Sequence, residues 1–253
     1  MNPFYESEDV LAEYLLFHYG KEADILPFSF GPKEALDFPV RCVSECLNLK
    51  CIPEKARALD LGCSVGRSSF ELARHCHEVI GIDNSASFIG AASQLREMGE
   101  VPYASRVEGE LRTSVTAQAP GGVARERVAF QVGDALDLPP DLGTFDVLLM
   151  ANLIDRLPRP AALLERLPDL VQPNGQLIIV SPYTWMEQFT PREHWLGGFE
   201  RDGRAVTTFG SLREILSPAF TLDARKDLPF LIREHARKYQ WSVAEATVWR
   251  RRR

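Results

Sequence analysis

Residues 57–76, RALDLGCSVGRSSFELARHC, determine the fold that we predict for this chain. An apolar run typical of a strand ends at Asp60, and Gly62 and Gly66 then enclose a short polar turn before a helical pattern begins. Because glycine lacks a Cβ atom, the backbone at such a turn can bend tightly and approach a ligand closely. The stretch therefore predicts a strand, a ligand-binding turn and a helix in direct succession; the alternative is a plain tight turn.

Downstream of this turn, short apolar runs alternate with helical patterns. This alternation is typical of a parallel sheet with helices on both of its faces. The last two apolar segments lie close together in the sequence and favour an antiparallel hairpin at the edge of the sheet. Strands are predicted at RALDLG, EVIGIDNS, VAFQVGDAL, FDVLLMANLID, GQLIIVSPY, FTLDARKDLPFLIRE and WSVAEATVWRR, and helices over 68–76, 88–98, 161–170 and around 212–216.

Upstream of the turn, residues 1–50 predict a helical N-terminal cap. Apolar and aromatic side chains from Leu11 to His18 recur at helical spacing, with Ser7 as the N-cap, and a second helical pattern covers about 38–49. Residues 99–127 form an insertion that is too long for a plain connection, so they either cover a site or form a small subdomain. We expect one domain over 1–253, made of the 1–50 cap, a core at 56–182, the 99–127 insertion, and a substrate loop with the C-terminal strands at 183–253.

The composition excludes several classes of function. The formal net charge of −6 disfavours nucleic acid as the main partner, and the run of arginines at 250–253 is expected to be a solvated tail. No apolar run approaches the roughly 18–20 residues of a membrane span, and the N-terminus lacks the pattern of a signal peptide. The 5 cysteines, odd in number and without CxxC spacing, favour free thiols in a reducing, cytoplasmic compartment and no metal site.

A second acidic residue that could contact a ligand follows the glycine turn. Asp83 lies at the end of the next predicted strand, at the sheet edge where open parallel sheets bind ligands, and it is well placed to accept both hydroxyls of an adenosine ribose. An acid at this position could equally bind the ribose of a nicotinamide dinucleotide. The G-x-G-x-x-G pattern of dinucleotide-binding sites is absent, however, because Ser64 stands where the middle glycine would be. An adenosine that carries a sulfonium and an amino-acid tail suits the turn better, since Asp60 can help to organise the loop around the tail's ammonium.

This arrangement resembles the class I S-adenosylmethionine-dependent methyltransferases over about residues 56–182. The resemblance implies a Rossmann-like α/β fold with a mostly parallel seven-stranded sheet, S-adenosyl-L-methionine as cofactor and S-adenosyl-L-homocysteine as product. It places the methionine part of the cofactor at the glycine turn, the ribose at Asp83 and the adenine beside VGDALDL, while MANLIDRL lies where cofactor and substrate meet. The cofactor-binding residues expected are Asp60, Gly62, Cys63, Ser64, Gly66, Arg67, Asp83, Asn84, Ser85, Asp134, Ala135 and Asn152.

Segments outside the cofactor half resemble a narrower family, the methyltransferase of ovothiol biosynthesis. They are YESEDVLAEYLLFHYG, FPVRC, LDLGCSVGRSSFELA, MANLIDRLPRP and SPYTWMEQFTPREHWLGGF. That family methylates a ring nitrogen of 5-thiohistidine (4-mercaptohistidine), and many members carry an iron-dependent sulfoxide synthase before this domain. The resemblance implies a thiohistidine-like amino acid as substrate, with this chain acting after a separate sulfoxide synthase, and it implies that the FHYG segment folds over the mouth of the cofactor site.

A zwitterionic aromatic acceptor needs a carboxylate partner, an ammonium partner and a flat wall. For several of the candidates below, a purely structural role stays open. Each tryptophan could be a core anchor, Arg41 could be a surface residue, and Asp155 and Arg156 could form a local pair at a helix start. The candidates are Arg41 and Arg156 for the carboxylate, Asp155 and Glu193 for the ammonium, and Tyr183, Trp185 and Trp195 for the wall, with Tyr19 also near the substrate.

Catalytic roles are expected for Asn152, Asp155 and Tyr19. Asn152 would orient a ring NH or the cofactor's ammonium, and Asp155 or His18 would act as the base if one is required. Three other functions stay open at this point: a methyltransferase with another N, O or S acceptor, a non-catalytic cofactor-binding regulatory module, and a dehydrogenase, which the glycine spacing disfavours.

Overall fold

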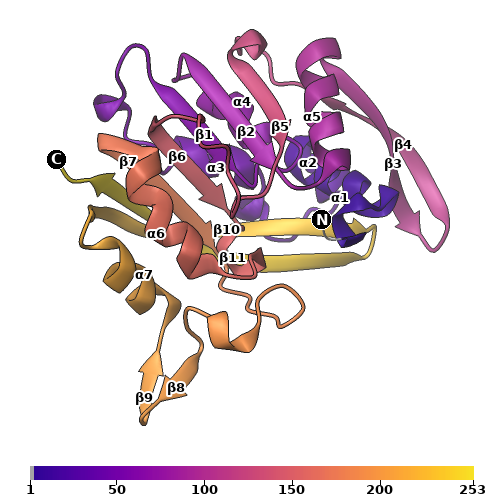
Figure 1. The fold of residues 1–253 in the computed structure, drawn as a ribbon. Helices are drawn as coiled ribbons and strands as arrows, with labels where there is room; N and C mark the ends of the chain where they lie inside the picture. Colours follow the sequence, from indigo (N-terminus) through magenta and orange to yellow (C-terminus); the bar gives the residue numbers. More distant parts are fainter. Residues whose placement is uncertain (1–2) are drawn as a thin grey trace.

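The computed structural model describes residues 3–253, and a twisted sheet with helices on both faces forms its centre (Figure 1). Within these residues, seven strands pair in the order β10-β11-β7-β6-β1-β2-β5. Strands β5, β2, β1, β6 and β7 run parallel, while β11 pairs antiparallel with both of its neighbours. The strands are β1 (Arg57–Leu61), β2 (Glu78–Asp83), β5 (Val128–Val132), β6 (Phe145–Ala151), β7 (Val171–Ser181), β10 (Phe220–His235) and β11 (Lys238–Arg251).

The two faces of the sheet are covered by different helices. One face packs on α1 (Glu8–Tyr19), α3 (Phe38–Ser44), α4 (Arg67–Leu72) and α5 (Ala86–Met98), and the other on α6 (Pro160–Leu170) and α7 (Thr208–Leu216). Strand β1 shows how the sequence builds both cores. Ala58 packs on the α4 side whereas Leu59 and Leu61 pack on the α6 side, because successive side chains of a strand point to opposite faces. Strands buried on both sides therefore read as continuous apolar runs.

The alternating elements predicted for the core are confirmed, although α4 and the cap helix α3 end earlier than expected. Helix α4 ends at Leu72 rather than at residue 76, and α3 ends at Ser44 rather than near residue 49. Ser7 is the N-cap of α1, as predicted, and its hydroxyl accepts from the Val10 backbone N–H at 3.3 Å. A one-turn helix, α2 (Glu22–Ile25), follows α1 and completes the N-terminal cap.

The predicted hairpin at the C-terminal end is present, but its order in the sheet corrects the expectation. Strand β11 inserts between β7 and β10, so β10 forms the edge. The arginine tail is also partly structured: Arg250 and Arg251 belong to β11, and Arg250 pairs with Asp223 at 2.9 Å. These two residues therefore belong to the sheet and not to a tail, although the side chain of Arg250 is exposed.

The insertion at 99–127 forms a separate two-stranded hairpin of β3 (Glu100–Glu108) and β4 (Leu111–Gln118), which packs against α1 and α5 (Figure 1). The strands of this hairpin do not line the cavity described below. A second hairpin, β8 (Phe199–Arg201) with β9 (Arg204–Val206), projects from the loop after β7 and was not predicted. Within residues 3–253, no helix has the length and apolar character needed to cross a membrane.

Candidate active site

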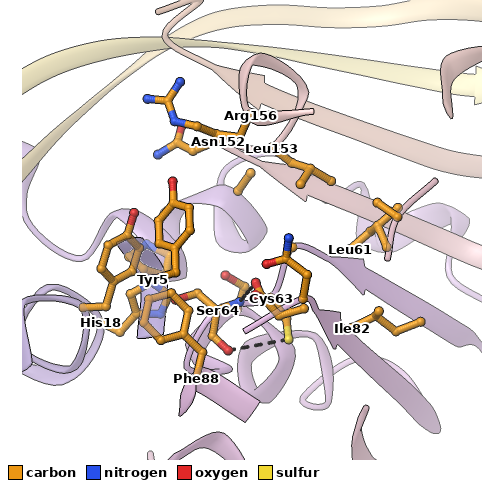
Figure 2. Close-up of a pocket in the computed structure, with 18 of the residues that line it drawn as sticks. Tyr5, His18, Leu61, Cys63, Ser64, Ile82, Phe88, Asn152, Leu153 and Arg156 are labelled. Atoms are coloured by element: carbon orange, nitrogen blue, oxygen red, sulfur yellow. Dashed lines mark hydrogen bonds between the residues drawn. The ribbon is translucent and has the colours of Figure 1, made fainter. Parts of the chain in front are cut away.

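A cavity opens where the strand order reverses, between β1 and β6 (Figure 2). Crossovers leave β1 to one side of the sheet and β6 to the other, so the carboxyl ends of these strands separate and leave a crevice there. The residues that follow β1, β2, β5 and β6 form its floor, and the N-terminal cap forms its roof. The floor residues are Leu61, Gly62, Cys63, Ser64, Asp83, Asn84, Gly133, Asp134, Ala135 and Asn152, and Arg156 belongs to the wall.

The glycine turn and Asp83 form one hydrogen-bonded unit in this floor. The Ser64 backbone N–H donates to Asp83 Oδ2 at 2.9 Å, and the Ser85 backbone N–H donates to Oδ1 at 3.0 Å. Gly62 adopts a φ of +77° and Ser64 one of +51°, so the turn passes through the left-handed region. Burial raises the pKa of Asp83, because a charged carboxylate loses solvation there.

Several predicted cofactor residues support this turn from behind and do not line the cavity. Asp60 is fully buried and accepts from Ser69 Oγ at 2.6 Å, and burial raises its pKa to about 7. Arg67 pairs with Glu71 at 2.9 Å. Ser85 caps α5, its hydroxyl accepting from the Phe88 backbone N–H at 3.2 Å. These residues shape the site without facing it.

Gly66 also has a different role from the predicted one. A Cβ atom at this position would lie 2.5 Å from Cζ of Phe130 and 3.1 Å from Cβ of Ala92. With a φ of +84°, Gly66 serves as the N-cap of α4 and lets that helix approach β5 and α5 closely. The missing side chain makes room for the core and not for a ligand.

Three buried polar atoms that lack a partner belong to residues that line the cavity. Ser64 Oγ, Asn152 Oδ1 and His18 Nδ1 are buried and find no hydrogen-bond partner among residues 3–253, and all three residues line the cavity. Asn152 also adopts a φ of +54°, which is uncommon for a residue other than glycine. Buried polar groups are nearly always paired in proteins, so this cluster identifies a ligand-binding site.

At the end of β6, Asp155 holds Arg156 against the cavity. Asp155 is fully buried, and its carboxylate accepts from the Thr184 backbone N–H at 2.9 Å, from Ser181 Oγ at 3.2 Å and from Arg156 Nη1 at 3.0 Å. Its oxygens are thus engaged, and it does not line the cavity. This corrects the expectation that Asp155 acts as a base or binds the substrate ammonium; it positions Arg156, whose guanidinium lies 4.8 Å from the ring centre of Phe189.

Most of the aromatic wall comes from the N-terminal cap, with Phe88 of α5 and Phe189 of the loop after β7, which the sequence did not reveal. Tyr14 and Phe88 pack with ring centres 4.9 Å apart, and Tyr5 contacts both of them and Phe189. Glu6 fixes this segment over the cavity, because its carboxylate accepts from the Ala86 backbone N–H at 3.1 Å and Ser87 Oγ at 2.7 Å. The aromatic residues that line the cavity are Tyr5, Tyr14, Phe17, Phe38, Phe88 and Phe189.

The wall predicted from the sequence lies elsewhere and anchors the loop after β7. The rings of Trp185 and Trp195 stack at 6.4 Å, and Trp185 Nε1 donates to Thr208 Oγ1 at 2.9 Å. The Tyr183 hydroxyl donates to Glu245 at 2.8 Å. None of these three aromatic residues lines the cavity; Trp185 packs partly buried against the core on the α6 side and, with Tyr183, lines a separate pocket beside the β8–β9 hairpin.

Arg41 and Glu193 are likewise outside the cavity. Arg41 Nε donates to Glu45 at 2.7 Å, and its Nη1 donates to the Pro229 carbonyl oxygen at 2.9 Å, which ties α3 to β10. Glu193 is exposed in the loop after β7. Of the predicted substrate residues, Arg156 is therefore the one that the structure places in the cavity wall.

The FHYG segment lies against the glycine turn. The Tyr19 hydroxyl donates to the Val65 carbonyl oxygen at 2.7 Å, so it ties α1 to the turn and does not line the cavity itself. His18 does line it, and burial lowers its pKa to about 3, which keeps the imidazole neutral. The proximity of this segment to the cofactor mouth agrees with the resemblance, whereas a catalytic contact by Tyr19 does not follow from its position.

Comparison with known proteins indicates which type of reaction this site catalyses. Residues 59–179 match the family model described as "Methyltransferase domain". The chain carries a methyltransferase domain. The matched segment contains the glycine turn, Asp83, Asp134 and Asn152 of the cavity floor and Arg156 of its wall. The protein is thus a methyltransferase enzyme with S-adenosyl-L-methionine as its cofactor, and its sheet has the Rossmann-like fold of the class I methyltransferases.

Solved structures share the fold of this methyltransferase at low sequence identity. The [4+2]-cyclase SpnF has a TM-score of 0.60 and 16% identity, and the match covers 99% of this chain and 94% of that chain. A SAM-dependent methyltransferase from Methanosarcina mazei has a TM-score of 0.53 and 18% identity, with 80% and 95% covered. The N-methyltransferase NodS from Bradyrhizobium japonicum WM9, in complex with S-adenosyl-L-homocysteine, has a TM-score of 0.52 and 15% identity, with 95% and 98% covered. At these identities the likeness establishes the fold alone.

No curated protein matches the sequence of this methyltransferase significantly. Its acceptor therefore has to be inferred from the cavity and from the resemblance of its sequence motifs.

Proposed function

We propose that this methyltransferase methylates an imidazole ring nitrogen of 5-thiohistidine to give ovothiol A. The observation that carries the proposal is the position of Arg156 in the wall of the cavity that also contains Asp83 and the glycine turn. Aromatic rings of the N-terminal cap line the space around them (Figure 2). A cation beside flat apolar walls suits a small aromatic acceptor that carries a carboxylate. The resemblance of the FHYG and MANLIDRL segments adds the identity of that acceptor.

The cofactor fits the floor of the cavity. Asp83 offers carboxylate oxygens to a ribose, and Ser64 and Asn152 offer buried polar atoms that otherwise lack partners. Asp134 and Ala135 lie where an adenine is expected. When bound, S-adenosyl-L-methionine supplies an electrophilic methyl group and leaves as S-adenosyl-L-homocysteine.

The chain itself binds and orients the reacting groups and excludes water from them. The attacking ring nitrogen forms a bond to the methyl carbon, the bond from that carbon to sulfur breaks, and the ring releases one proton. A 5-thiohistidine ring is already poised for attack, so a strong base is not required. Asp155 is occupied by its own hydrogen bonds, and burial lowers the pKa of His18 to about 3, so neither residue is suited to that role. Catalysis then rests on orientation and the exclusion of water, and orientation alone can supply about 7–11 kcal/mol of the barrier.

Incubation of the purified protein with methyl-labelled cofactor and a panel of histidine derivatives tests this function. We expect kcat/KM for 5-thiohistidine to exceed that for histidine by at least about 100-fold, because a site that reads a polar group rejects analogues lacking it. The product should carry the methyl group on a ring nitrogen, which proton NMR can assign.

Other outcomes of this experiment separate the competing functions. Equal rates on 5-thiohistidine and histidine would show that the enzyme does not recognise the sulfur of 5-thiohistidine. Transfer to another N, O or S acceptor would replace the substrate while keeping the reaction. Binding of S-adenosyl-L-homocysteine without transfer to any member of the panel would favour a non-catalytic module.

Substitution of Arg156 by glutamine is expected to raise KM for 5-thiohistidine about tenfold. The guanidinium supplies a charge-assisted hydrogen bond to the acceptor carboxylate, worth about 1.5–3 kcal/mol. Affinity for S-adenosyl-L-homocysteine, measured by calorimetry, should change less than twofold. Arg41→Gln is the matched control, since Arg41 ties α3 to β10 outside the cavity. A similar rise in KM for both variants would remove Arg156 from the acceptor site.

A further inference from the structure

Tyr5 of the N-terminal cap lies beside Arg156 in the cavity wall, although the two residues are far apart in the sequence (Figure 2). Both pack on the same ring. The ring centre of Phe189 lies 6.3 Å from that of Tyr5 and 4.8 Å from the Arg156 guanidinium. Burial raises the pKa of Tyr5, and the charge of Arg156 and its hydrogen bond to the Tyr5 hydroxyl offset part of that rise. The hydroxyl thus keeps its proton at neutral pH and lies next to a cation.

The position of Tyr5 is also fixed through its backbone. Ser85 Oγ donates to the Tyr5 carbonyl oxygen at 3.2 Å, and the Ser85 backbone N–H donates to Asp83. The adjacent Glu6 carboxylate accepts from the Ser87 backbone N–H at 3.3 Å. The N-terminal segment is therefore attached to the start of α5, next to the acid that is expected to hold the ribose. Tyr5 is held over the cavity before any acceptor binds.

The two side chains can bind a carboxylate together. A guanidinium carries five N–H groups, and the hydrogen bonds of Arg156 to Asp155 and Thr184 use Nη1 alone. A tyrosine hydroxyl that accepts from a guanidinium can also donate its own hydrogen to a carboxylate oxygen. Hydrogen bonds to a charged group are stronger than those between neutral groups, so a carboxylate gains from both donors.

An ammonium finds a poorer environment beside Arg156. Among the residues of 3–253 that line the cavity, the acids are Asp83 and Asp134. Asp83 is expected to hold the ribose, while Asp134 lies at the expected adenine position and accepts from the Leu136 backbone N–H at 2.8 Å. Asp155 is engaged with Arg156 outside the lining. Because like charges repel, an amino group close to the guanidinium is disfavoured and a carboxylate is favoured.

We propose that Tyr5 and Arg156 together bind the carboxylate of the acceptor, and that the site takes thioimidazole carboxylic acids with or without an amino group. This inference rests on the acceptor class of the proposed function. It adds Tyr5 to the acceptor site and widens the substrate class from one amino acid to the carboxylic acids that share its ring.

Three ligands that differ in one group each test the inference. They are 5-thiohistidine, its deamino analogue, which lacks only the amino group, and 5-thiohistamine, which lacks only the carboxylate. Calorimetry is carried out on the protein saturated with S-adenosyl-L-homocysteine. We expect the deamino analogue to bind within about threefold of 5-thiohistidine, and 5-thiohistamine to bind at least about 30-fold more weakly, because it leaves both donors without their acceptor.

The Tyr5→Phe variant tests the contribution of the hydroxyl. It keeps the ring that packs on Tyr14 and Phe189 and removes only the donor. Binding of 5-thiohistidine and of its deamino analogue should weaken about tenfold, while binding of 5-thiohistamine and of S-adenosyl-L-homocysteine should change less than twofold. Tyr183→Phe is the matched control, since the Tyr183 hydroxyl donates to Glu245 outside the cavity, and it should leave all four affinities unchanged.

Two results would overturn the inference. One is a loss of more than tenfold when the amino group is removed, which would show that the site recognises the ammonium. The other is an equal loss of all three ligands in Tyr5→Phe, which would indicate that Tyr5 has only a structural role. Binding in the expected order without methylation of 5-thiohistidine would contradict the proposed function and would leave the carboxylate site supported.

Discussion

Replacement of Asp83 by alanine is expected to weaken S-adenosyl-L-homocysteine binding by about 100-fold. A carboxylate that accepts two ribose hydroxyls makes two charge-assisted hydrogen bonds, each worth about 1.5–3 kcal/mol, and alanine removes both. The Ser64 and Ser85 backbone N–H groups also lose their acceptor, so the glycine turn becomes less ordered. Calorimetry with the purified variant measures the change in affinity.

The Asp83 variant should remain folded. Burial raises the pKa of Asp83, so its charged form is less favourable in the folded protein than in the unfolded chain, and removal of the charge does not itself destabilise the fold. Loss of the two backbone hydrogen bonds costs about 1–2 kcal/mol, which thermal unfolding can follow. Unchanged affinity for S-adenosyl-L-homocysteine would remove Asp83 from the ribose site.

Replacement of Gly66 by alanine is expected to lower the free energy of unfolding by about 3 kcal/mol. The left-handed conformation of a residue with a Cβ atom costs about 1–2 kcal/mol, and overpacking of a core adds about 1–3 kcal/mol. Both costs apply here, because φ is +84° and the new Cβ atom would lie 2.5 Å from the ring of Phe130. Urea denaturation measures the loss.

Gly90→Ala is the matched control for this prediction. Gly90 lies within α5, and a Cβ atom there would meet nothing within 4 Å. Alanine in a helix interior is favoured over glycine by roughly 0.5–1 kcal/mol, so this variant should be slightly more stable than the natural protein. Equal stability of the two variants would show that neither strain nor crowding operates at Gly66.

The core of the fold could be predicted because its signals are local. The period of the apolar runs, the glycine turn after β1 and the acid at the end of β2 each occupy a few consecutive residues. Parallel strands bring their carboxyl ends together, so Asp83 and Ser64 could be placed at one site before any contact was known. The hydrogen bond between them at 2.9 Å agrees with that prediction.

The acceptor side could not be predicted in this way. Trp185 and Trp195 are as rich a chemical signal in the sequence as Tyr5 and Phe189, yet they stack on each other outside the cavity. Composition identifies aromatic side chains but not the partners against which they pack. Arg41 and Arg156 were similarly equal candidates, and long-range hydrogen bonds to Pro229 and Thr184 separated their roles.

The sequence by itself determined the α/β core, the glycine turn and the acids of the cofactor floor, because strand and turn preferences act between near neighbours. Only the tertiary structure decided that β11 enters the sheet between β7 and β10, that Gly66 makes room for Phe130, and that the N-terminal cap roofs the cavity with Tyr14 and His18. Each of these depends on close packing between segments far apart in the chain, and such packing leaves no periodic or local mark in the order of residues.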